Sequence, residues 1–116
     1  PVMAMGGTLD TGTPYHWGTQ RTYDHVSSDR KAQVGFENAE HMIFGSTCDV
    51  LPFYTEVGFG SGCIDQVWDM ARAHDLINHF TTAFLLAELK GDTDAAAALS
   101  PDSVAFPGVS YTAQGY

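Results

Sequence analysis

Two short segments typical of β-strands, with one helix-like segment between them, constrain the fold of this chain most strongly. Residues 1–5 (PVMAM) are apolar and end at two glycines, which indicates a buried strand. Residues 31–37 carry Val34 and Phe36 in alternation with other side chains and predict a second strand. Because residues 14–26 between them have helical periodicity, the order predicts a parallel strand–helix–strand unit and an α/β fold.

A long helix is the clearest feature of the second half of the chain. Residues 64–90 repeat apolar side chains at i, i+3, i+4 and i+7, and Gly91 follows where a helix-ending glycine belongs. The glycine-rich residues 45–63 before this helix indicate a loop bounded by cysteines. We expect residues 92–116 to form an extended tail with a short helical turn near its start.

A sheet of two strands is unstable by itself, so the predicted unit needs further strands beside it. The chain has 116 residues, of which 44% are apolar, and this suffices for the core of one small domain. It also opens directly on a predicted strand. We therefore expect residues 1–116 to be the segment of one α/β domain that another chain completes.

The two cysteines lie in a segment rich in turn residues. Cys48 and Cys63 are separated by Pro52 and several glycines. We expect a disulfide between them, with two buried free thiols as the alternative. A disulfide would place the protein outside the reducing cytosol, in an extracellular or periplasmic compartment.

The charge of the chain excludes several classes of partner. Five Lys and Arg residues stand against 14 Asp and Glu residues, so the formal net charge is −9. Such a surface repels phosphate backbones and anionic lipid headgroups, so we expect neither a nucleic-acid nor an anionic-membrane partner. No apolar run approaches the roughly 20 residues that span a bilayer, and no membrane span is expected.

Two polar side chains follow the two predicted strands. Asp10 lies just after the first strand and His41 just after the second. Since sites in open α/β sheets form outside the carboxyl ends of the strands, we expect this pair to meet there. The imidazole Nδ1–H would then donate to the carboxylate, as in a catalytic triad. The alternative is that Asp10 caps a turn and His41 is an ordinary loop histidine.

Two motifs around this pair resemble the α/β-hydrolase fold. Residues 7–14 (GTLDTGTP) resemble the segment that carries the catalytic acid, most closely in the dienelactone-hydrolase-like branch, with cutinases and platelet-activating-factor acetylhydrolases nearby. Residues 33–41 (QVGFENAEH) resemble the segment that delivers the catalytic histidine. The resemblance covers residues 1–91 and implies the C-terminal portion of that fold: the last two parallel strands, their connecting helix and the long final helix.

The resemblance implies a carboxylic ester hydrolase that works through an acyl-serine, with Asp10 and His41 as catalytic acid and base. The sequence departs from the family at two points. Asn38 stands near the place where the family has a glycine before the histidine, although Asn tolerates left-handed backbone better than most residues. The chain also has no G-x-S-x-G nucleophile motif; the nearest sequence, residues 60–62 (GSG), follows Phe59 and lies after the histidine.

A companion chain is therefore expected to supply the serine. The expected source is the N-terminal part of the same precursor, which would carry Gly-x-Ser-x-Gly and form a heterodimer with this chain. The resemblance leaves open whether the substrate is a small ester, a lipid or a polyester. The alternative function, from a different class, is a non-catalytic acidic domain that binds a partner through its exposed apolar strands.

Three further residues are candidates for contact with the substrate. Tyr15 and Trp17 lie about one helical turn beyond Asp10, and Met42 directly follows His41. Aromatic packing on the sheet is the competing interpretation for the first two. The spacing of the histidines does not match a helical metal pair, so we expect neither a metal nor a cofactor.

Overall fold

The structure, a computed structural model, describes residues 1–58 and 60–116 and contains one mixed β-sheet. Its strands are β1 (Val2–Gly7), β2 (Lys31–Phe36) and β3 (Val109–Gln114), in the order β1-β2-β3. β1 and β2 run parallel, as the sequence predicts, and β3 pairs antiparallel with the other edge of β2. The chain is therefore α/β in content.

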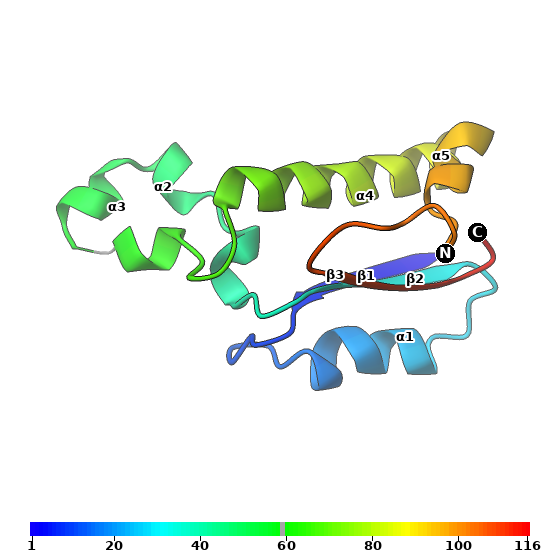
Figure 1. The fold of residues 1–116 in the computed structure, drawn as a ribbon, viewed down its shortest axis with the longest axis horizontal. Coiled ribbons are helices and arrows are strands. Elements are labelled where there is room, and N and C mark those ends of the chain that lie inside the picture. Colours follow the sequence, from blue (N-terminus) through cyan, green and yellow to red (C-terminus); the bar gives the residue numbers. More distant parts are fainter. Residues whose placement is uncertain (59) are drawn as a thin grey trace.

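Helices cover both faces of this sheet (Figure 1). On one face lie η1 (His16–Gln20) and α1 (Arg21–His25), which together form the connection between the parallel strands. On the other face lie α4 (Met70–Lys90) and the short α5 (Thr93–Ala98). The predicted strand–helix–strand order is thus present, and its helical part spans residues 16–25 in place of 14–26.

The core lies between the sheet and α4. Phe36 and Phe80 are its largest fully buried side chains. Burying apolar surface of this kind is the main favourable term in folding. The buried cluster comprises Val34, Phe36, Ala39, Ile43, Trp68, Ala73, Leu76, Phe80, Ala83 and Leu99.

The C-terminal tail is more ordered than the sequence suggests. Its last part forms β3, where Val109, Tyr111 and Ala113 are half-buried and the residues between them are exposed. The Tyr111 hydroxyl donates to the Leu99 carbonyl at 2.7 Å, and burial raises the pKa of Tyr111 to about 12. Residues 109–114 are thus extended, as expected, and in addition they pair with β2 as a third strand of the sheet.

The long helix begins six residues later than predicted. Asp69 is its N-cap and accepts a hydrogen bond from the Arg72 backbone N–H at 2.9 Å, so α4 starts at Met70. The apolar residues Ile64 and Val67 mimic the helical period, but both are exposed in the segment before the cap. The helix ends as predicted at Gly91, which has a left-handed φ of 66°.

Residues 45–64, the projecting segment, extend from the body of the molecule (Figure 1). A loop was expected over residues 45–63, and this stretch contains three single-turn helices: α2 (Thr47–Val50), α3 (Phe53–Glu56) and η3 (Gly60–Cys63). A disulfide joins Cys48 to Cys63 with a Cα–Cα distance of 5.7 Å, which confirms the predicted pairing. A disulfide is compatible with an oxidising compartment.

Unpaired sheet edges and exposed apolar side chains remain at the surface of the described structure. Within the described residues, β1 pairs only with β2, so its other edge carries unpaired backbone groups. The projecting segment exposes several large apolar side chains: Val50, Leu51, Phe53, Val57 and Ile64. None of the helices described is both long enough and apolar enough to cross a bilayer.

Candidate functional site

Asp10 and His41 form a charge-compatible pair at the carboxyl ends of β1 and β2. The His41 Nδ1 atom lies 2.8 Å from the Asp10 Oδ2 atom. The carboxylate is buried, with its side chain 3% exposed, whereas the imidazole is 58% exposed. If Nδ1 carries the proton that is donated to Asp10, the lone pair is on Nε2 and the ring can act as a base there.

The loop after β1 holds the Asp10 carboxylate from several directions. Its Oδ1 atom accepts hydrogen bonds from the backbone N–H groups of Gly12 and Thr13, at 2.8 and 2.7 Å. Its Oδ2 atom accepts from the Thr13 hydroxyl at 2.8 Å, besides facing His41. Both carboxylate oxygens are thus fixed before any substrate arrives.

These hydrogen bonds and the burial of the side chain together set the pKa of Asp10. Burial by itself would raise the pKa of the carboxyl group. The hydrogen bonds from Thr13, His41 and Gly12 outweigh burial and lower the pKa of Asp10 below its ordinary value of 3.8. The carboxylate is therefore ionised at neutral pH and can stabilise an imidazolium at His41.

The backbone turns sharply between β2 and His41. Asn38 adopts a left-handed φ of 58°, a conformation that Asn tolerates better than most residues. Its N–H donates to the Thr8 hydroxyl at 2.8 Å, which links this turn to the loop that carries Asp10. His41 then opens the short helix η2 (His41–Phe44).

A groove of about 260 Å³ lies beside the pair. Its walls come from β1, from the helical segment that follows the Asp10 loop, and from Phe44. The groove therefore joins the uncovered edge of β1 to the exposed imidazole. It is lined by Ala4, Met5, Gly6, Asp10, Thr13, Gly18, Thr19, Thr22, His41 and Phe44.

The structure does not place the three predicted substrate contacts in this groove. Tyr15 packs against the sheet, where its hydroxyl accepts a 2.6 Å hydrogen bond from the Gln33 amide and lies over Gly35. Trp17 is 63% exposed, with the Arg21 guanidinium 5.4 Å from its ring centre. Met42 is half-buried, with its methyl group near Gly45. None of the three is among the residues lining the groove.

Sequence reasoning missed two residues that belong to the site. Thr13 contacts Asp10 through both its backbone and its hydroxyl, and its position three residues after an Asp is a recognisable turn signal. Phe44 lines the groove because η2 brings it to the same side as His41. Phe44 lies three residues after His41 in the sequence, but the sequence does not show on which side of the chain its ring lies.

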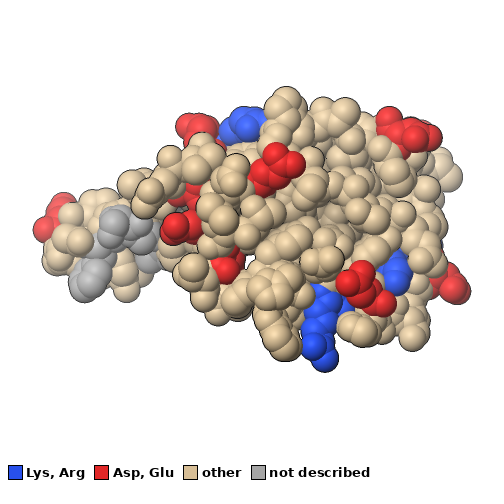
Figure 2. Space-filling model, turned by 60° about the horizontal axis from the view of Figure 1, so that its bottom comes forward, with Lys and Arg blue, Asp and Glu red and all other residues tan. Residues whose placement is uncertain are grey.

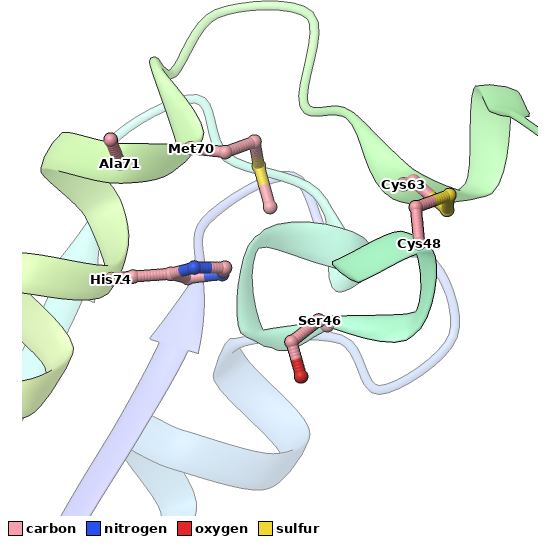
Figure 3. A pocket seen from close by; sticks show the side chains of 7 residues that line it. Ser46, Cys48, Cys63, Met70, Ala71 and His74 are labelled. Carbon is pink, nitrogen blue, oxygen red and sulfur yellow. A yellow bond between two sulfur atoms is a disulfide. The ribbon is translucent and has the colours of Figure 1, made fainter. Parts of the chain in front are cut away.

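A second cavity, of about 310 Å³, lies at the base of the projecting segment (Figure 3). Figure 3 shows the His74 imidazole extending from α4 toward Met70 and Ser46, with the disulfide on the far side. The Nε2 atom of His74 is buried without a hydrogen-bond partner. This cavity shares no lining residue with the groove, and it holds no carboxylate to pair with its imidazole, so the groove is the better candidate for chemistry.

In the described part of the chain, no three His, Cys, Asp or Glu side chains form a group that could hold a metal ion. No protein family, no curated protein and no solved structure matches the chain. The functional argument therefore rests on the geometry of the site.

Proposed function

We propose that this chain supplies the acid and the base of a serine carboxylic ester hydrolase. The observation that carries the proposal is the 2.8 Å contact between a buried, ionised carboxylate and an exposed imidazole, Asp10 and His41, at the carboxyl ends of two parallel strands. This is the arrangement that a triad uses to hold its histidine in the basic tautomer. The resemblance of residues 7–14 and 33–41 to the α/β-hydrolase segments supports the same assignment.

The proton moves through the exposed nitrogen of His41. The Nε2 atom accepts the proton of a serine hydroxyl as the oxygen attacks the ester carbonyl, and then returns it to the leaving alcohol. Water then attacks the acyl-serine and gives its proton to Nε2. This proton passes to the serine oxygen as the carboxylic acid leaves. Asp10 keeps its negative charge throughout, orients the ring through Nδ1 and stabilises the imidazolium.

The serine comes from a companion chain with a Gly-x-Ser-x-Gly motif. The unpaired edge of β1 supports this proposal, because a sheet edge of this kind recruits a further strand. A strand that pairs there would border the groove and end close to His41. Ser61, within the GSG sequence of this chain, has a side chain outside the described part of the structure.

The substrate is a small ester, a lipid or a polyester, and the protein works in an extracellular or periplasmic compartment. The net charge of −9 supports a neutral substrate over an anionic one. The disulfide supports the location.

Hydrolysis of p-nitrophenyl butyrate by the native assembled protein tests this function. His41→Ala and Asp10→Ala should each lower kcat at least a hundredfold, because either change removes the activated base. His25→Ala is the matched control, since His25 is exposed on α1 and lies outside the groove. Unchanged turnover in both site variants would discard the enzyme and favour the alternative, a non-catalytic binding domain.

A further inference from the structure

Asp65 is a buried carboxylate that the proposed mechanism does not use. Its Oδ1 atom accepts hydrogen bonds from the backbone N–H groups of Val67 and Trp68, both at 2.9 Å, and so closes the turn before α4. Its Oδ2 atom accepts from the backbone N–H of Glu40 at 2.8 Å. Glu40 directly precedes His41, so one oxygen of Asp65 holds the peptide from which the catalytic histidine emerges.

Trp68 holds the other end of the same loop. Its indole Nε1–H donates to the Glu37 carbonyl at 2.8 Å, where the chain leaves β2. The ring packs edge-on against Phe36 at 5.4 Å between centroids, and the Arg72 guanidinium lies 4.8 Å from its centre. The indole is therefore fixed by the core on one side and by a cation on the other.

These two side-chain contacts add to a loop that is also held by backbone hydrogen bonds at Glu37 and Ala39 and by the burial of Ala39. Residues 37–40 reverse direction through the left-handed Asn38, and Glu37, Asn38 and Glu40 are exposed. The imidazole that follows is largely exposed, and its Nδ1 atom lies 2.8 Å from Asp10 Oδ2 and 3.4 Å from the Thr13 hydroxyl. Because a displacement of about 1 Å can cost a hundredfold in rate, the position of this loop matters to the reaction.

We infer that Asp65 and Trp68 are positioning residues for His41, acting through the Glu40 and Glu37 peptides across 25 and 31 residues of sequence, respectively. The inference rests on the proposed function for its catalytic consequence. The placement of the His41 ring is a separate consequence that does not need activity. The disulfide partner Cys63 lies two residues before Asp65, so the projecting segment begins and ends close to this clamp.

Paired variants of the native assembled protein test the inference. Asp65→Ala removes the acceptor for Glu40, and Trp68→Phe removes the indole N–H while keeping an aromatic ring against Phe36. The matched control is Asp69→Ala, which also removes an Asp that accepts a backbone N–H, that of Arg72, but that makes no hydrogen bond to residues 37–40 in the described structure. Thermal unfolding identifies a temperature at which all variants are folded.

Two readouts are measured at that temperature. The first is kcat and KM for p-nitrophenyl butyrate, and the second is the NMR signal of the His41 Nδ1–H proton in protein with ¹⁵N-labelled histidine. We expect Asp65→Ala to lower kcat about tenfold or more with KM changed less than twofold, and to broaden or shift the proton signal. Trp68→Phe should do the same to a smaller degree, and Asp69→Ala should leave both readouts unchanged.

Equal effects of Asp65→Ala and Asp69→Ala, or no effect of Asp65→Ala on either readout, would overturn the inference. An assembled wild-type protein that hydrolyses no ester would instead overturn the proposed function. The NMR comparison would still decide whether Asp65 and Trp68 place the ring.

Discussion

At the scale of single residues, the site combines a buried, fully hydrogen-bonded carboxylate, Asp10, with a largely exposed imidazole, His41. Asp10 has every oxygen lone-pair direction engaged by Gly12, Thr13 or His41. His41 presents the other side of its ring to solvent and to the groove. This asymmetry suits a histidine that has to exchange protons with a partner arriving from outside the chain.

The lowered pKa of Asp10 gives a pH dependence of stability with a defined sign. The folded-state value lies below the ordinary 3.8, so the stabilisation is fully present well above 3.8 and is lost as the pH falls past 3.8 and through the folded-state value. Asp10→Asn removes this titration and keeps the side-chain volume. We expect the difference in unfolding free energy between the wild type and Asp10→Asn to be larger at pH 7 than at pH 3.

Urea unfolding of both proteins at the two pH values measures this difference. A difference that is the same at pH 7 and pH 3 would contradict the assignment of the shift to the folded state. The same argument predicts that any loss of activity between pH 7 and pH 4 does not come from protonation of Asp10.

At the scale of elements, the apolar periodicity of the sequence predicted the features that depend only on neighbouring residues. The parallel strands and the end of the long helix follow from apolar spacing and from Gly91, and the structure contains them. The start of the helix was misplaced because Ile64 and Val67 continue the apolar period, while the Asp65 and Asp69 side chains capture the backbone N–H groups instead.

The apolar pattern of the sequence does not predict which segments distant in the chain come into contact. The sequence VSYTAQ of β3 was expected to be extended, but nothing in it indicated that the segment pairs with β2. The approach of Asp10 to His41 was expected from a general rule about strand ends, whereas the contact of Asp65 with Glu40 follows from no local signal. Side-chain-to-backbone bonds of that kind are set by tertiary packing.

The disulfide gives a prediction about the projecting segment. Its helices are single turns with exposed apolar side chains, so they have little packing of their own. We expect the double variant Cys48→Ser, Cys63→Ser to lose about 3 kcal/mol of stability, the chain-entropy value for a loop of this length. Chemical denaturation measures the loss, and the wild type under non-reducing conditions is the reference.

An unchanged unfolding free energy in the double variant would contradict this prediction. It would mean that packing rather than the cross-link orders the segment.

At the scale of the whole molecule, the proposed function makes this chain one subunit of an assembled enzyme. Among the described residues both outer strands of the sheet have an unpaired side, a groove beside β1 leads to the Asp10–His41 pair, and the projecting segment exposes apolar surface. Acidic groups are scattered over the face shown in Figure 2, with few basic groups among them. Such a surface does not favour nucleic acid, and it leaves the large uncharged areas free for a protein partner.

The most direct test of the central claim is covalent labelling of the native protein with a fluorophosphonate probe, followed by mass spectrometry of every chain that carries the label. We predict one modified serine, in a Gly-x-Ser-x-Gly sequence on a companion chain that copurifies with this one. The label should be lost in His41→Ala and retained in His25→Ala. A label that persists in His41→Ala, or native protein in which no companion chain reacts, would contradict the account.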